Sequence, residues 1–479
     1  YKTQNSIINI TDGELISTAD YAVYLPQSGT TTISGGKVYG AAGGVCIQRG
    51  TLNVEGTALI TSKGTGSTGN WGDGTGGLDC AAINVSGAYG IATVNIKGGT
   101  LIAEAKSLIT EGTTYTPVIN VTGGTFSDPS ALKYMKTNAN VNIKLTADKT
   151  CPGFKTTSGQ TLTMDLGGKI LTLADPTVGS TGTETNSCQL LEGSNVTFKN
   201  GTLKSDNNKI MIQNYCNLTL DNMTVEDTNA QYVVSNNCGN ISINNTTINA
   251  GSNANQFAFD VCGYAKYTAG VTVTVSGTSV INGKVEISKS AGNTEPMKLN
   301  ITGGTFNGDL KVDASVGTEN AKSIISVSGG TFSDPSVLKY MATNATVDIK
   351  LLSNINIAKT ELATGYILNA ANATANLNLN GHDIINSSET ADATPFTQIF
   401  TVQNGTLNIS GNGNVKCDAS ATAKDDGYRM VIEARGHGTV NIHGGSYYNT
   451  QKLNTQIDLI YARENGKINI YGCLLYTSP

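Results

Sequence analysis

Short strands of alternating apolar and polar residues return along the whole chain, and each ends in a glycine or asparagine turn. Early copies read TISGG from Thr32, LNVEG from Leu52 and VNIKGG from Val94; late copies read LNISG from Leu407 and VNIHGG from Val440. Alternation with a period of two predicts strands with one buried face, and the glycines favour tight turns between them.

A strand of three to five residues cannot bury its apolar face alone. Stacked on the next copy at a strand spacing of about 4.8 Å, it can. Most clear copies lie about 21 to 33 residues apart, and no helix-length segment follows each strand. The sequence therefore predicts an all-β fold, a right-handed parallel β-helix or solenoid. Val, Ile and Leu would fill its core, and outward Asn, Thr and Ser would stack into ladders.

One thirteen-residue stretch occurs twice, as GGTFSDPSALKYM from Gly123 and GGTFSDPSVLKYM from Gly329. Its Asp-Pro pair predicts a helix start, because the aspartate can accept free backbone N–H groups and proline suits the first helical position. Each copy is followed by a fresh strand pattern, so we expect a short capping helix between modules. The apolar residues expected to be buried under these helices are Leu132, Met135, Leu338 and Met341.

The offset of about 206 residues between the copies predicts tandem modules. We expect residues 1–140 to be the C-terminal part of a β-helix module, 141–346 a complete module, and 347–472 the N-terminal part of a further one. The last seven residues, CLLYTSP at 473–479, resemble a translated sequencing adapter and break the composition of the chain. The natural chain is expected to continue past Gly472 with more solenoid sequence.

Charge and hydropathy narrow the choice of partners. Charged residues make up 14% of the chain, the formal net charge is −5, and arginine occurs only at Arg49, Arg429, Arg435 and Arg463. A nucleic-acid backbone is therefore not expected as a partner. No apolar run approaches the roughly 18 residues that a membrane span needs. Nothing in the pattern fixes an oligomeric state.

The GGTFSDPS stop and the strand-turn LNLNG from Leu377 resemble secreted and cell-surface β-helix proteins of gut bacteria, placed in the pectin-lyase-like superfamily. The resemblance implies an extracellular, adhesin-like or structural protein that presents a binding surface for carbohydrate or for host or cell-surface ligands. Two alternatives stay open: a carbohydrate-active enzyme of the same fold (a polysaccharide lyase or glycoside hydrolase), and a segment of a phage tail-spike or fibre.

The densest set of reactive side chains lies in DDGYRMVIEARGHGTVNIHGG, from Asp425 to Gly445. Polygalacturonases, which share the fold, combine Asp-Asp with Gly-His-Gly, but their Asn-Thr-Asp and Arg-x-Lys motifs are missing here. Pectate lyases use an arginine base, and no arginine occurs between Thr93 and Ile409. Ordinary solvated charges are thus the favoured interpretation. If the chain is an enzyme, its catalytic candidates are Asp425, Asp426, Arg435 and His437.

The glycine-rich loop from Gly64 to Cys80 carries the only tryptophan. Trp71, with Asp73 and Asp79, is the candidate ligand-binding set, because an exposed indole can stack on a sugar ring. One partial Gly-Asp copy is weak support for Ca²⁺, and no metal or cofactor is expected. A loop without a ligand is the alternative.

Nine cysteines occur without a C-x-x-C pair, which argues against zinc. Cys216, Cys238 and Cys262 are 22 and 24 residues apart, close to one coil each. We expect three free thiols stacked in one column, since parallel side chains suit a disulfide torsion poorly.

Overall fold

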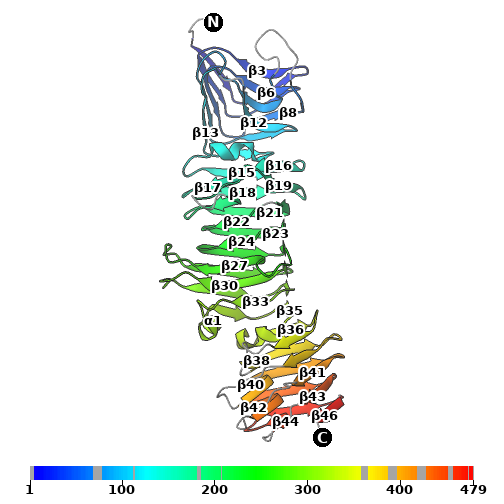
Figure 1. Ribbon diagram of the computed structural model, residues 1–479. Coiled ribbons are helices and arrows are strands. Elements are labelled where there is room, and N and C mark those ends of the chain that lie inside the picture. The colour runs from blue at the N-terminus through cyan, green and yellow to red at the C-terminus, as the bar shows by residue number, and fades with distance from the viewer. Residues whose placement is uncertain are drawn as a thin grey trace. The chain divides into compact units, whose positions relative to one another are not determined.

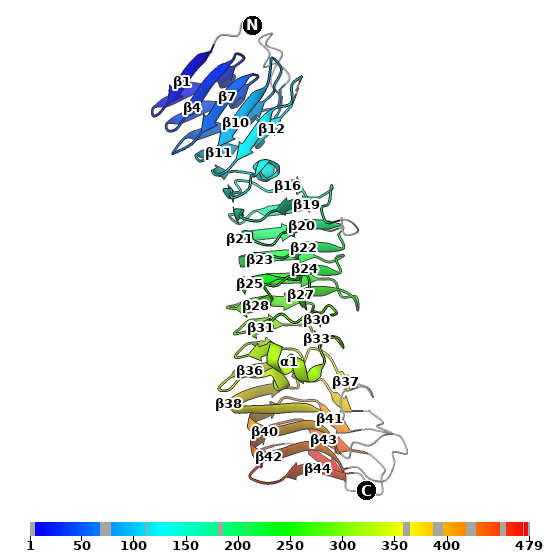
Figure 2. The ribbon, with the colours of Figure 1, turned by 90° about the vertical axis from the view of Figure 1, so that its left-hand side faces the viewer.

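The computed structural model describes residues 5–67, 78–111, 114–180, 185–206, 208–357, 365–386, 396–417, 428–450, 457–472 and 474–477. The chain divides into two compact units, Tyr1–Ile241 and Ser242–Pro479. Within each unit the paired strands run parallel, and the coils stack as shown in Figures 1 and 2. The predicted all-β parallel solenoid is confirmed.

The first coils of unit 1 have three strands each, which build three parallel sheets. Sheet A contains β1 (Ser6–Ile10), β4 (Gly29–Ile33), β7 (Gly50–Val54), β10 (Ala92–Ile96) and β13 (Val118–Val121). Sheet B contains β2 (Glu14–Ser17), β5 (Lys37–Gly40), β8 (Leu59–Ser62), β11 (Thr100–Ala103) and β14 (Thr125–Phe126). Sheet C contains β3 (Tyr21–Leu25), β6 (Gly43–Ile47), β9 (Ala81–Val85) and β12 (Lys106–Thr110).

A short 3-10 helix, η1 (Pro129–Tyr134), follows these coils along the chain. The strands that follow are β15 (Asn140–Lys144), β16 (Lys149–Pro152), β17 (Phe154–Thr156), β18 (Thr161–Asp165), β19 (Ile170–Ala174), β20 (Asn186–Leu190), β21 (Asn195–Lys204), β22 (Ile210–Asn214), β23 (Asn217–Asp227) and β24 (Tyr232–Asn236). β25 (Gly239–Asn244) spans the division between the units.

Unit 2 repeats the plan with an α-helix and a second 3-10 helix. Its first elements are β26 (Thr247–Ala250), β27 (Phe257–Gly263), β28 (Val271–Ser276), β29 (Val280–Asn282), β30 (Lys284–Lys289), β31 (Met297–Ile301), β32 (Thr305–Phe306), β33 (Leu310–Val312), α1 (Thr318–Ile324), β34 (Ile325–Val327), β35 (Thr331–Phe332) and η2 (Pro335–Tyr340). The remaining strands are β36 (Thr346–Lys350), β37 (Ile355–Ile357), β38 (Tyr366–Asn378), β39 (Ile384–Asn386), β40 (Phe396–Ser410), β41 (Asn414–Cys417), β42 (Tyr428–Ile442), β43 (Ser446–Asn449), β44 (Ile457–Ala462), β45 (Lys467–Ile470) and β46 (Leu474–Thr477).

The register of the strands produces both the core and the predicted polar ladders. Val54, Ile96 and Val121 occupy one inward column of sheet A and are fully buried. One residue away, each asparagine amide donates to the asparagine of the preceding coil. Asn95 Nδ2 lies 2.9 Å from Asn53 Oδ1, and Asn120 Nδ2 lies 2.8 Å from Asn95 Oδ1. Apolar stacking inside and amide stacking outside therefore stabilise the same strand alignment.

Unit 2 has a ladder of the same kind, in the order Asn376, Asn408, Asn441 and Asn469, with three amide-to-oxygen distances of 2.8 Å.

Both predicted helix starts are present. The carboxylates of Asp128 and Asp334 accept hydrogen bonds from Ser130 N and Ser336 N, and the following prolines occupy the first helical turn. Leu132, Leu338 and Met341 are buried, whereas Met135 is half-buried.

Neither helix interrupts the solenoid. β14 pairs directly with β15, and β35 pairs directly with β36, so one ladder runs past each helix. In unit 1 the helix covers the edge of sheet C instead, because Asp128 and Ser130 accept hydrogen bonds from the backbone N–H groups of Ser107 and Leu108 on β12. The helix thus ends one sheet while its neighbour continues, which protects an edge that could otherwise pair with another strand.

The module limits at residues 140 and 346 stay a prediction, and the division between the compact units falls elsewhere. Within the tail CLLYTSP, Leu474–Thr477 form β46, which pairs with β43. The origin of that tail also stays a prediction. Among the described residues, no helix is long and apolar enough to cross a membrane.

Candidate functional site

The charged segment of β42 is held by contacts between neighbouring coils. The buried Glu433 carboxylate accepts a hydrogen bond from Arg463 Nε at 2.7 Å, and Arg463 also pairs with Glu464 at 3.1 Å. The hydrogen bond to Glu433 raises the pKa of Arg463. Glycoside hydrolysis needs two carboxyl groups that flank a substrate, whereas the Glu433 carboxylate is buried and bound to Arg463 of the next coil. We therefore assign Glu433 to the stability of these coils.

The predicted catalytic residues do not form a described cluster. Asp425 and Asp426 lie outside the described residues. In its favoured amide orientation, Gln403 accepts hydrogen bonds from the Arg435 guanidinium. His437 is exposed and aligns with Asn404 on the neighbouring strand. Arg435 and His437 thus face separate partners of the preceding coil, and the enzyme hypothesis gains no support from them.

Of the tryptophan loop, the structure describes residues 64–67 and 78–80. Trp71 and Asp73 lie outside the described residues, whereas Asp79 belongs to a hydrogen-bond network over sheet C. The Asp79 carboxylate accepts from Ser67 Oγ at 3.0 Å, and its carbonyl accepts from Tyr21 Oη at 2.7 Å. Its amide donates to Glu111 Oε1 at 2.6 Å. Asp79 thus anchors the loop, and its role in ligand binding stays a prediction.

Burial explains the state of the cysteines. All eight that the structure describes are free thiols. Burial raises the pKa of Cys216 to about 12, which suppresses the reactive thiolate. Cys216 and Cys238 follow β22 and β24 at equivalent positions, in agreement with the predicted column. Cys262 differs, because it lies inside β27 and is only half-buried. No cluster of metal-binding side chains occurs among the described residues.

A groove follows the outer face of sheet B. Ile16, Tyr39, Thr61 and Ile102 occupy one outward column on β2, β5, β8 and β11. They line a hollow of about 930 Å³ together with Lys37, Lys63 and Glu104. Ile16 is 57% exposed and Ile102 38% exposed. The column covers three strand spacings, about 14 Å, and offers an apolar strip with charges at its sides.

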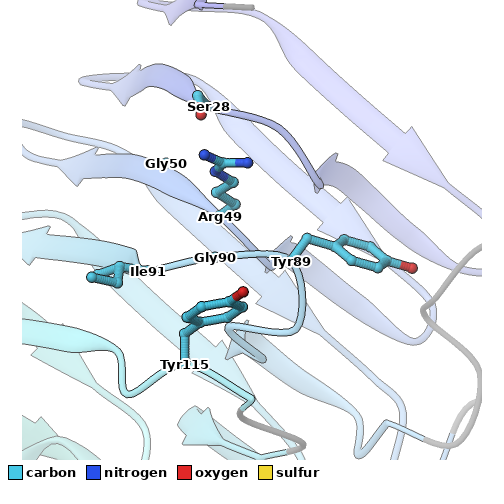
Figure 3. A pocket seen from close by; sticks show the side chains of 7 residues that line it. All are labelled: Ser28, Arg49, Gly50, Tyr89, Gly90, Ile91 and Tyr115. Carbon is cyan, nitrogen blue, oxygen red and sulfur yellow. The ribbon is translucent and has the colours of Figure 1, made fainter. Parts of the chain in front are cut away.

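A smaller hollow lies where the chain turns from sheet C into sheet A. Four successive turns contribute to it: Ser28 follows β3, Arg49 follows β6, Tyr89 to Ile91 follow β9, and Tyr115 follows β12. Its volume is about 400 Å³. Figure 3 shows the Arg49 guanidinium directed toward Ser28 and Gly50, with the Tyr115 ring on the other side of the Gly90 segment. We call this the Arg49 hollow.

Glycine at position 90 makes room for the arginine. A Cβ atom there would lie 2.7 Å from Arg49 Cδ and 2.8 Å from Arg49 Nε. The Arg49 side chain therefore rests flat against the backbone and is half-buried. Its guanidinium has no hydrogen bond or ion pair within the described part of the chain.

Sequence patterns gave little warning of either hollow. Arg49 is the only arginine in the first 428 residues, and this rarity was the one feature of the sequence that could have marked it as a candidate binding residue. The outward residues of sheet B look like ordinary polar and apolar alternation until the register is known.

No family model matches this chain, and neither does any curated protein or solved structure.

Proposed function

We propose that this protein is an extracellular β-solenoid of the bacterial cell surface that binds carbohydrate through the groove on sheet B. The observation that carries the proposal is the outward column Ile16, Tyr39, Thr61 and Ile102, which leaves apolar side chains exposed along one line. A sugar ring has an apolar C–H face and a rim of hydroxyl groups, and such a strip with polar edges can hold both.

The polar edges support an extended ligand. Lys37 and Glu104 line the groove, and Lys37 Nζ lies 3.8 Å from Glu14 Oε1 with both side chains partly exposed.

The rigidity of the sheet adds to the proposal. Ligand-facing side chains on paired strands are held at a fixed spacing. The protein therefore loses little conformational entropy when a ligand binds. This favours a surface for recognition and attachment.

The test is native electrophoresis of the full chain through gels that contain xylan, β-glucan, mannan, alginate or polygalacturonate. We expect retardation by at least one polysaccharide. Tyr39→Ala should weaken it about tenfold, which is the worth of roughly one aromatic contact. Tyr461→Ala is the matched control, since Tyr461 is also a partly exposed outward tyrosine, on β44 of unit 2. Equal retardation of the wild type and Tyr39→Ala would refute the groove as the binding site.

A further inference from the structure

We infer that the Arg49 hollow binds an acidic sugar unit, with the sugar carboxylate on the Arg49 guanidinium and the ring against Tyr115. The inference rests on the proposed function for the class of ligand alone, because the hollow and the sheet B groove share none of their described lining residues.

The Arg49 hollow carries a positive charge. Arginine remains protonated at all relevant pH values. Arg49 is half-buried in a hollow whose other described lining residues are Ser28, Gly50, Tyr89, Gly90, Ile91 and Tyr115, and none of these is acidic. A positive group without a counter-charge, partly removed from water, favours an anionic ligand.

The shape of the donor set selects a carboxylate. A guanidinium presents parallel N–H groups that match the two oxygens of a carboxylate. Phosphate sites usually add backbone N–H groups, but three of the N–H groups at this hollow are already engaged. Gly50 N donates to Ile91 O, Tyr89 N to Gln48 O, and Tyr115 N to Gly87 O.

The apolar surface beside Arg49 favours a ligand with a sugar ring. Tyr115 is 48% exposed and Ile91 is 59% exposed, and both line the hollow with Arg49. A pyranose can place its C–H face on such surfaces while its carboxylate reaches the guanidinium. Figure 3 shows the Tyr89 hydroxyl pointing away from Arg49, so we assign the ring contact to Tyr115. The volume of about 400 Å³ suits one or two sugar units.

A second hollow of about 200 Å³ adjoins the first, since Arg49 lines both. It contains Tyr24 of β3, and Pro26 and Gln27 from the turn that follows. Further units of an acidic oligosaccharide could occupy it, which makes a trisaccharide a suitable probe.

The test is calorimetric titration of the full chain with a galacturonate trisaccharide and with its carboxyl-reduced, neutral counterpart. We expect the acidic trisaccharide to bind at least about tenfold more tightly. Arg49→Gln should remove that preference, Arg49→Lys should keep part of it, and Tyr115→Ala should weaken binding several-fold. Tyr39→Ala should leave this titration unchanged, so failure of the sheet B groove would not be mistaken for failure of the Arg49 hollow.

Three results would overturn the inference: equal affinity for the acidic and neutral trisaccharides, unchanged affinity in Arg49→Gln, or equally tight binding of a short peptide that offers only a C-terminal carboxylate. Circular dichroism of each variant shows whether the solenoid is intact. Lys97→Gln is the charge-matched control and should bind as the wild type does, since Lys97 is an exposed cation directly after β10 and pairs with Glu55.

Discussion

The two 3-10 helices share almost the same sequence but have different surroundings. In η1, the Asp128 carboxylate caps its own helix and also accepts hydrogen bonds from the amide and hydroxyl of Ser107, the latter at 2.6 Å. In η2, the Asp334 carboxylate accepts hydrogen bonds from Ser336 alone, through its backbone N at 2.6 Å and its side chain, among the contacts described, and burial raises the pKa of Asp334. Local sequence thus fixes the helix, while the neighbouring coil decides what each side chain contributes.

The tyrosines show the same contrast. Tyr134 is half-buried and its hydroxyl lies 3.0 Å from Thr110 Oγ1. Tyr340 is 3% exposed, and its hydroxyl has no partner within the described residues. η2 packs against β38, whereas η1 lies over β12 and β13. The second helix is therefore the more deeply buried and the less well satisfied of the two.

Truncation of the buried leucines should give the largest effect. Leu338 is 1% exposed and Leu132 is 9% exposed. We expect Leu338→Ala to lower the free energy of unfolding by about 3 kcal/mol, and Leu132→Ala by about 2 kcal/mol. Urea unfolding followed by circular dichroism measures both, with the exposed Lys133→Ala as the control. The reverse order would contradict the difference in burial.

Removal of the capping carboxylates should give the next largest effect, in the opposite order. Asp128→Ala leaves the Ser107 amide without its acceptor as well as the helix start, so we expect a loss of about 2 kcal/mol. Asp334→Ala removes only the cap of its own helix, and a loss of about 1 kcal/mol or less is expected. Equal losses in the same urea experiment would show that Ser107 adds nothing.

Alkaline pH should reveal the burial of Tyr340 as a loss of stability. Burial raises the pKa of Tyr340 to about 12, above the ordinary value of about 10. The unfolded chain therefore ionises Tyr340 first, and the stability that this group contributes is complete below pH 10 and lost between pH 10 and 12. At pH 11 the loss is about 1.4 kcal/mol. Tyr340→Phe should lack this component, which a comparison of urea midpoints at pH 8 and pH 11 would reveal.

Hydroxyl removal at neutral pH should give the smallest effect. Tyr340→Phe deletes a buried hydroxyl without a described partner and should be neutral or stabilising by up to about 1 kcal/mol. Tyr134→Phe loses the contact with Thr110 and should destabilise by about 0.5 kcal/mol. Thermal unfolding of the pair is the measurement, and a destabilised Tyr340→Phe would indicate that its hydroxyl is satisfied.

Features that depend on local sequence could be predicted, whereas those that depend on contacts between coils could not. Alternation in LNVEG and VNIKGG predicted the strands, and Asp-Pro predicted the helix starts, because both signals are local. Cys262 was misplaced in the column because coil length varies, and a spacing of 24 residues does not reveal that it lies inside β27. The Arg49 hollow was missed for the same reason, since its four turns come together only when the register of four coils is known.

The most direct test of the proposed carbohydrate surface is hydroxyl-radical footprinting of the full chain with and without the polysaccharide that retards it most. Binding at sheet B should protect Ile16, Tyr39 and Ile102 from oxidation and leave the exposed Tyr471 of unit 2 unchanged. Retardation without protection of those three side chains would contradict the account.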